Sequence, residues 1–223
     1  MRPIMKHGLL QNQRDTSSWC VRWQNGMNSM LLADGAILTG TYPDSDVLRR
    51  LAEEEYPFVL LGECDIPNDQ IDSVQSDHEP ASYEATWHLL DLHHRNIGII
   101  IEELELPHHR LRLAGAQRAI SEVTGAKLIM ISGEDLADAG YFEGLMREHR
   151  ITALLGAHRN LLDPTFSLLE RLSLRVPEDI SVICLSMSWS LHMNNPTRVR
   201  LNRDEAGQIA VNLLTERLDG TAG

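Results

Sequence analysis

Short apolar runs alternate along the chain with longer segments of helical periodicity. The short runs are apolar at consecutive positions, which is typical of strands buried on both faces of a parallel sheet. The strands that this pattern predicts are 8–11, 36–39, 58–61, 97–101, 127–131, 153–155 and 180–185.

The segments between these runs repeat apolar residues every three or four positions, as amphipathic helices do. In the last of them, Ala206, Ile209 and Leu213 fall on one stripe, and Gly220 is placed to end the helix. The helices predicted in this way are 44–55, 80–92, 110–123, 136–148, 163–172 and 204–218. The alternation of strand and helix predicts a doubly wound α/β fold with right-handed crossovers.

The charge balance argues against nucleic acid as a direct partner. The 223 residues suffice for one large domain or two small ones with a hydrophobic core. The formal net charge is −12, and an acidic chain repels phosphate backbones unless it carries a separate basic face. The densest basic group is only Arg198, Arg200 and Arg203. We therefore expect no direct binding of nucleic acid by this chain.

The sequence also predicts no membrane segment and no secretory signal. No apolar run reaches the length of about 18 residues that spanning a bilayer requires, and residues 1–15 lack the apolar core of a signal peptide. The three cysteines, Cys20, Cys64 and Cys184, are odd in number and far apart. This usage favours a reducing cytoplasm over a disulfide scaffold, and we expect Cys184, within an apolar run, to be a core residue.

No motif in the sequence points to catalysis or to a metal. The nucleophile elbow, the phosphate-binding loop and the dinucleotide fingerprint do not occur. The acidic runs 53–55 and 102–105 fit solvated ends of secondary structure better than paired catalytic carboxylates. Among the ten histidines, His88 and His93 are five positions apart, whereas a helical zinc pair needs four. We expect no enzymatic activity, no cofactor and no bound metal.

Six blocks of the sequence resemble, in order, the effector-binding part of the LacI/GalR transcription repressors. They are LADGAILTG (32–40), YPFVLLGE (56–63), VQSDHEPASYEATWHLLDLHHRNIGII (74–100), HHRLRLAGAQRAI (108–120), LRVPEDISVICLS (174–186) and NPTRVRLNRDEAGQIAVNLLTERLDG (195–220). The block that contains VPEDIS is the most specific for the family. The resemblance extends from about His7 to Gly220, nearly the whole chain.

The resemblance implies a two-lobed, periplasmic-binding-protein-like fold of type I, with a small-molecule site in the cleft between doubly wound parallel sheets. One lobe would contain residues 1–95 and 188–220, and the other residues 96–187. Family members begin with a helix-turn-helix head, then a strand and a helix, and end with a short strand; none of these is found here, so the sequence predicts a fold truncated at both ends. The resemblance also implies a homodimer.

The same resemblance nominates ligand-binding residues. Arg112 matches the effector-binding arginine of the family and Asp77 matches a cleft aspartate, although each also has an ordinary interpretation, Arg112 as a surface helix residue and Asp77 as a helix cap. Arg159 stands where the family has a second aspartate, and Ser186 replaces an acidic residue after the strand 180–185. Trp189 follows, where it could stack on a sugar or pack at a lobe interface.

These changes leave the predicted cleft with fewer acceptors and one more cation. They favour a phosphorylated or acidic sugar, held by Arg112 and Arg159, over a neutral sugar. Two other hypotheses remain open at this stage: a stand-alone solute-binding protein, and a degenerate remnant that binds no ligand.

Overall fold

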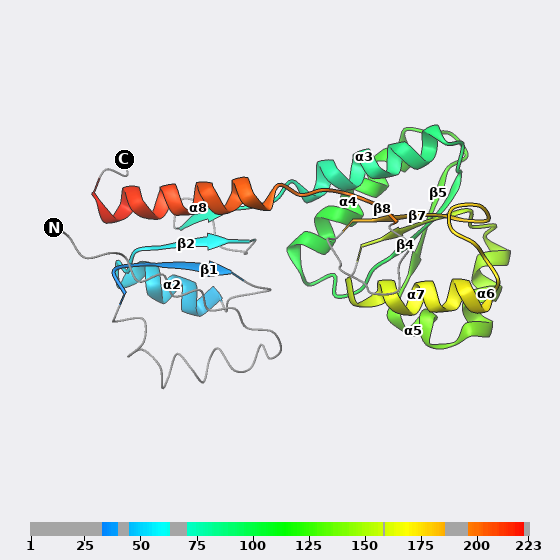
Figure 1. Cartoon of the computed structure of the whole chain (residues 1–223), viewed down its shortest axis with the longest axis horizontal. Coiled ribbons are helices and arrows are strands. Elements are labelled where there is room, and N and C mark those ends of the chain that lie inside the picture. The colour runs from blue at the N-terminus through cyan, green and yellow to red at the C-terminus, as the bar shows by residue number, and fades with distance from the viewer. Residues whose placement is uncertain (1–32, 40–44, 63–70, 158, 186–195, 221–223) are drawn as a thin grey trace. The chain divides into compact units, whose positions relative to one another are not determined.

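The computed structural model describes residues 33–39, 45–62, 71–157, 159–185 and 196–220 (Figure 1). The chain forms two compact units. Unit 1 comprises Met1–Ser76 with Asn202–Gly223, and unit 2 comprises Asp77–Leu201. No helix in these described ranges is long and apolar enough to cross a membrane.

Unit 1 is built on a parallel sheet in the order β1-β2-β3, with a helix on each face. Phe58 and Leu60 of β2 pack on one face with Leu48 and Leu51 of α2. Val59, between them in the strand, packs on the other face with residues of α8, as the alternation of side chains along a strand requires. The elements are β1 (Ala36–Thr39), α2 (Ser45–Glu53), β2 (Phe58–Leu61), β3 (Asp72–Val74) and α8 (Arg203–Leu218).

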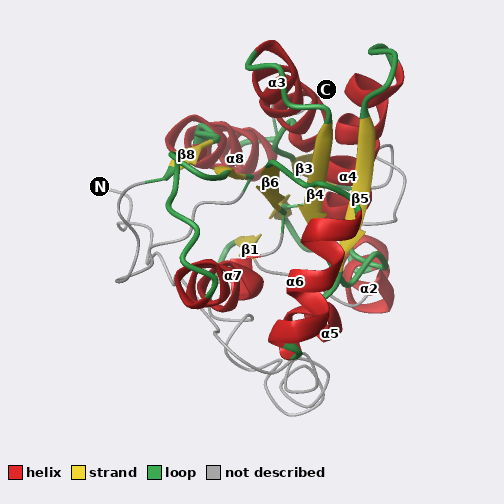
Figure 2. Ribbon diagram, turned by 90° about the vertical axis from the view of Figure 1, so that its right-hand side faces the viewer, coloured by secondary structure: helices red, strands yellow, loops and turns green. Residues whose placement is uncertain are grey.

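Unit 2 contains a parallel sheet in the order β5-β4-β6-β7-β8, and Figure 2 shows β4 and β5 of this sheet side by side. The reversal of strand order between β5-β4 and β4-β6 is characteristic of doubly wound folds. Its strands are β4 (Asn96–Ile100), β5 (Lys127–Ile131), β6 (Ala153–Gly156), β7 (Ser181–Cys184) and β8 (Thr197–Arg198). Its helices are α3 (His78–Asp91), α4 (Pro107–Ser121), α5 (Gly133–Ala137), α6 (Ala139–Glu148) and α7 (Arg159–Arg171).

Two apolar clusters cover the faces of this sheet. Ile97 and Ile99 of β4 belong to the cluster that also contains apolar buried residues of α3 and α4, such as Leu89 and Ala116. Ile100 belongs to the opposite cluster, which contains residues of α5, α6 and α7 such as Phe142 and Leu169. The helices therefore lie on both faces of a parallel sheet, and the predicted fold class of unit 2 follows from buried strands that are apolar on both sides.

A single predicted helix over 136–148 is wrong in detail, because the chain forms α5 and α6 instead. Asp138 separates them with an extended backbone, and its carboxylate accepts hydrogen bonds from the backbone N–H of Gly140 and Tyr141. Such a side chain caps the first turn of a new helix. The predicted strand 8–11 lies outside the described residues.

Helix α3 belongs to unit 2 because it packs along α4. The Ser82 hydroxyl donates to the Arg112 carbonyl at 2.6 Å, and a Cβ on Gly115 would lie only 2.2 Å from the Glu79 carbonyl oxygen. The division of a complete sensor into lobes at 1–95 with 188–220 and at 96–187 stays a prediction.

The VPEDIS block forms a closed turn before β7. Asp179 accepts hydrogen bonds from the backbone N–H of Arg175 at 2.9 Å and from its guanidinium at 2.6 and 3.0 Å. In return, the Asp179 N–H donates to the Arg175 carbonyl at 2.8 Å. The bonds to Arg175 hold the pKa of the Asp179 carboxyl at about 2.

Candidate functional site

The carboxyl ends of β4, β6 and β7 lie together at one edge of the unit 2 sheet. The strands remain paired up to this edge, since the Ala157 N–H donates to the Ile100 carbonyl and the Leu185 N–H donates to the Gly156 carbonyl, each at 2.9 Å. Ligands of open α/β sheets bind outside the carboxyl ends of the strands, at the point where the strand order reverses. This edge is therefore the place to look for the predicted site.

Arg112 of α4 reaches this edge. Its side chain is buried, with 7% exposed, and its Nη1 donates to the Ala157 carbonyl at 2.7 Å, one residue beyond the end of β6. Its Nη2 lies 3.4 Å from Nδ1 of His78, the first residue of α3. The structure thus places Arg112 at the predicted edge of the sheet, and the surface-helix interpretation of this arginine is wrong.

The packing of α3 on α4 determines where this guanidinium lies. The backbone carbonyl of Arg112 accepts from the buried Ser82 hydroxyl, and the Thr86 hydroxyl donates in turn to the Ser82 carbonyl at 2.7 Å. Gly115, one turn further along α4, lets the helix backbones approach more closely than any side chain would allow. The position of Arg112 therefore depends on small and hydroxyl-bearing residues at the helix interface.

Asp77 immediately precedes His78 at the N-cap position of α3. Its backbone carbonyl accepts from the Ala81 N–H at 3.0 Å, but its side chain makes no capping hydrogen bond and is exposed. The Asp77 side chain therefore does not cap α3, contrary to the helix-cap interpretation. Through its neighbour His78, Asp77 lies at the same end of α3 as the Arg112 guanidinium.

Three histidines also gather beside Arg112, and sequence reasoning did not include them in the site. The rings of His78 and His108 have centroids 5.7 Å apart, and those of His108 and His109 lie 4.2 Å apart. Nδ1 of the buried His109 lies 3.2 Å from the Glu103 carbonyl, which can only accept, so this nitrogen carries the proton. A signal was available, because His108 precedes Arg112 by four positions on one helix face.

Of the three other predicted site residues, the structure describes only the backbone of Arg159. Arg159 is the first residue of α7, two positions after Ala157, so its backbone begins at the same edge. Ser186 and Trp189 lie outside the described residues; Ser186 directly follows Leu185, whose N–H closes the β7 end of the edge. The structure therefore brings Asp77 and Arg112 to one edge, and the side chains of the remaining three stay predictions.

The chemistry of this edge is that of hydrogen bonding and charge. Within the described ranges there is no group of three or more histidine, cysteine, aspartate or glutamate side chains that could hold a metal ion. Cys184, at the end of β7, is buried, and burial raises the pKa of its thiol to about 11, so it is a poor nucleophile at neutral pH.

Comparison with known proteins agrees with this architecture. The family described as "Periplasmic binding protein-like domain" matches residues 86–223, and "Periplasmic binding proteins and sugar binding domain of LacI family" matches residues 29–119. The HTH-type transcriptional repressor PurR of Klebsiella pneumoniae (strain 342) is 28% identical over 190 residues, which cover 82% of this chain and 55% of that protein. The chain thus spans about half the length of the curated relatives it matches.

Solved structures share the fold. The transcription regulator CcpA of Lactococcus lactis is 21% identical, with a TM-score of 0.75 over 94% of this chain and 80% of that one. A regulatory protein of the LacI family from Chloroflexus aggregans is 20% identical, with a TM-score of 0.75 over 94% of this chain and 78% of that one.

The fold is that of the type I periplasmic-binding-protein-like domains. Within that class, the chain belongs to the effector-binding domains of LacI-family transcriptional regulators.

Proposed function

We propose that this chain senses a small-molecule effector, a sugar or a phosphorylated or acidic sugar, for a LacI-family transcriptional regulator. One observation carries the proposal: the buried Arg112 guanidinium lies at the carboxyl edge of the unit 2 sheet, bonded to the Ala157 carbonyl. A guanidinium presents several donors in a planar fork, the geometry that recognises hydroxyl, carboxylate and phosphate oxygens of a ligand.

The residues around Arg112 support a preference for an anion. Nδ1 of His78 lies 3.4 Å from the guanidinium, and the His78 ring lies 5.7 Å from that of His108. The sequence has a cation, Arg159, where the resemblance predicts an aspartate. The exposed Asp77 carboxylate supplies an acceptor suited to sugar hydroxyls. A ligand with both hydroxyls and a negative group matches this combination.

Effector binding would be passed on by movement of the lobes. In this proposal the lobes 1–95 with 188–220 and 96–187 close on the effector, and the change reaches an operator-binding head of the kind that full-length relatives carry. The chain itself would not contact DNA, since its net charge is −12. It would act as a homodimer in the cytoplasm.

Thermal unfolding with a ligand panel tests the proposal. Glucose 6-phosphate, ribose 5-phosphate and gluconate are compared with glucose and ribose, each at 10 mM. Binding to the folded state alone raises the unfolding temperature in proportion to ln(1 + [L]/Kd), so we expect a rise of several degrees with the anionic ligands. Arg112→Gln should abolish the rise.

Two outcomes count against the proposal. Stabilisation by neutral sugars alone overturns the preference for an anion but leaves the sensor intact. No stabilisation by any member of a broad metabolite library overturns the sensor and favours a remnant without a ligand.

A further inference from the structure

The contact between Arg112 and His78 determines which ring nitrogen of His78 carries a proton. Nη2 of Arg112 lies 3.4 Å from Nδ1 of His78. A guanidinium has donors only and is not deprotonated in proteins, so Nδ1 is the acceptor of this contact and carries no proton. The half-buried imidazole is therefore the neutral tautomer, with its proton on Nε2.

Helix α4 brings a guanidinium and two further imidazoles to this end of α3. The permanent charge of Arg112 is in contact with His78 and opposes a second positive charge there. The half-buried His108 has its ring centroid 5.7 Å from that of His78 and 4.2 Å from that of His109. Glu103, in the segment before α4, meets this cluster with its backbone carbonyl, to which Nδ1 of the buried His109 donates at 3.2 Å.

The carboxylates on either side of His78 along the chain are in different situations. Glu79, the next residue of α3, accepts from the Arg118 guanidinium, so its charge is matched by that of another residue of α4. Asp77 precedes His78, and its side chain is exposed, so solvent and salt screen its charge. At the same edge of the sheet, α7 begins with a further cation, Arg159. Among the described contacts of the imidazole, the closest charge is therefore the guanidinium.

We propose that His78 distinguishes anionic effectors from neutral ones by taking up a proton when an anion binds at Arg112, a role that rests on the proposed function. A protonated Nδ1 cannot face Nη2 of Arg112, because both groups would then donate. An anionic oxygen that accepts from both groups removes this conflict, and its charge favours the proton on the ring. A neutral sugar hydroxyl brings no such charge and leaves His78 neutral.

Proton uptake makes the affinity for an anion depend on pH. The unbound site holds fewer protons than the bound site, so binding strengthens as the pH falls through the range in which histidine titrates. The uptake of one proton limits the gain to about tenfold for each pH unit. We expect an anionic effector to bind about fivefold to tenfold more tightly at pH 5.5 than at pH 7.5, and a neutral sugar to bind equally at both.

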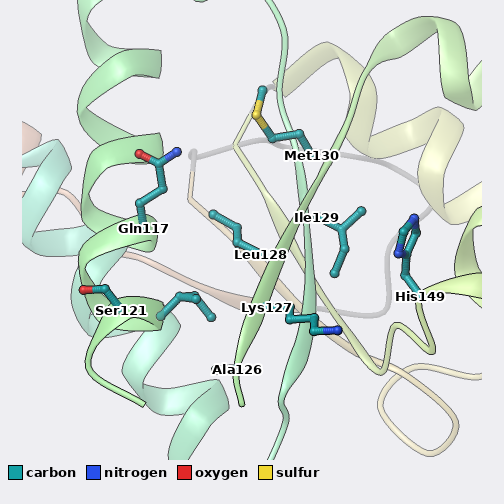
Figure 3. A pocket seen from close by; sticks show the side chains of 9 residues that line it. Gln117, Ser121, Ala126, Lys127, Leu128, Ile129, Met130 and His149 are labelled. Carbon is teal, nitrogen blue, oxygen red and sulfur yellow. The ribbon is translucent and has the colours of Figure 1, made fainter. Parts of the chain in front are cut away.

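Titration calorimetry with three probes tests this linkage. Gluconate and glucose 6-sulfate keep a constant charge between pH 5.5 and 7.5, and glucose is neutral, so any pH dependence belongs to the protein. His78→Gln retains an acceptor for Nη2 of Arg112 in its amide oxygen but takes up no proton, so its affinity for the anionic probes should be equal at both pH values. The matched control is His149→Gln, which should keep the full dependence. His149 lines a groove of about 700 Å³ along β5 that contains no residue of the Arg112 site (Figure 3).

Nitrogen-15 NMR of the histidine rings reads the proton directly. The His78 signals are those lost in His78→Gln. Without a probe at pH 7.5, Nδ1 of His78 should be unprotonated, and saturating gluconate at pH 6.5 should shift the ring toward the doubly protonated form, whereas glucose should not.

The outcomes separate this role of His78 from the proposed function. Equal affinity for the anionic probes at both pH values, a pH dependence that survives in His78→Gln, or a His78 ring that stays neutral with gluconate bound would overturn the role of His78 and leave the sensor intact. Absence of binding by both anionic probes at both pH values overturns the preference for an anion and the role of His78 with it, and the metabolite library then decides whether the chain is a sensor.

Discussion

The Arg112 guanidinium donates to the Ala157 carbonyl at 2.7 Å and so joins the second turn of α4 to the carboxyl end of β6. The bond crosses from a helix on one face of the sheet to the sheet edge itself. It aims a permanent cation at the point where the strand order reverses, next to His78 of α3. The geometry accounts for a buried arginine that would otherwise be costly, because its charge is hydrogen-bonded and directed toward the edge.

Replacement of Arg112 by lysine should separate charge from geometry. A lysine keeps the positive charge but has one compact donor group in place of a planar fork, so it cannot hold the Ala157 carbonyl and an anionic ligand in the same arrangement. We expect effector affinity, measured by titration calorimetry, to fall at least tenfold. Stability should fall by about 1.5–3 kcal/mol, the usual worth of a hydrogen bond to a charged group.

The exposed Arg147 provides the control for this substitution. Arg147→Lys should leave both effector affinity and stability unchanged. Unaltered affinity in Arg112→Lys would remove Arg112 from the binding site.

Gly115 should be intolerant of even one methyl group. A Cβ there would lie 2.2 Å from the Glu79 carbonyl oxygen and 3.0 Å from the Tyr83 backbone nitrogen, and both are backbone atoms that can yield only if α3 moves away from α4. Overpacking of this kind costs about 1–3 kcal/mol, or more where the backbone is rigid. We expect Gly115→Ala to lower the free energy of unfolding in urea by at least that amount, and to weaken effector binding through the displaced Arg112.

Gly144 of α6 is the matched control, since a Cβ there would meet nothing within 4 Å. Gly144→Ala should stabilise the protein by up to about 1 kcal/mol, the difference in helix propensity. If the two glycine variants behave alike, the close approach of α3 and α4 is not what Gly115 provides.

The sequence predicted strands 36–39, 58–61 and 127–131 to the residue because each contains a run of at least three consecutive apolar residues, which is a signal in the local sequence. It did not predict β3 and β8. Asp72–Val74 has one apolar residue in three, and Thr197–Arg198 has none. Each of these strands forms because a neighbouring strand, β2 or β7, has an edge with which it can pair. The presence of that edge depends on the tertiary structure and not on the local sequence pattern.

The candidate site, like the fold, could be predicted only in part. The resemblance pointed to Arg112 and Asp77, and periodicity placed them on or just before helices. The partners of Arg112 could not be predicted, because Ala157 lies 45 positions away and His78 lies 34 positions away. They meet only once α3, α4 and β6 have packed, so no spacing along the chain records their proximity.

His94 should make stability depend on pH at the amino-terminal edge of the unit 2 sheet. Its ring lies between the Thr152 and Ser181 hydroxyls, 2.8 Å from one and 2.9 Å from the other, and desolvation lowers the pKa of this histidine from 6.5. Because the unfolded chain then binds the proton more readily, the contribution is complete above pH 6.5 and is lost as the pH falls below it. We expect the unfolding free energy to decline between pH 6.5 and 5.

Two variants distinguish the contribution of His94 to this pH dependence from that of the other nine histidines. His94→Gln should flatten part of the decline, whereas His88→Gln, at an exposed position of α3, should leave the curve unchanged. Parallel curves for the unaltered chain and His94→Gln would show that His94 titrates alike in the folded and unfolded states.

Asp179 should contribute to stability with the opposite dependence. Its carboxylate accepts three hydrogen bonds from Arg175, and these hold its pKa at about 2, below the ordinary 3.8. A lowered carboxyl pKa stabilises the folded state above pH 3.8, and the contribution disappears as the pH falls toward 2. Asp179→Asn should therefore lower the urea midpoint at pH 7, modestly because the pair is exposed to solvent, and the gap from the unaltered chain should narrow below pH 4.

Glu178→Gln tests whether this effect belongs to the turn or to net charge alone. Glu178 precedes Asp179 and has the same charge. In the described turn, the hydrogen bonds from the Arg175 N–H and guanidinium go to Asp179. Removal of the Glu178 charge should leave the urea midpoint at pH 7 nearly unchanged. If Glu178→Gln and Asp179→Asn lower the midpoint equally, the closed turn of the VPEDIS block contributes nothing beyond its charge.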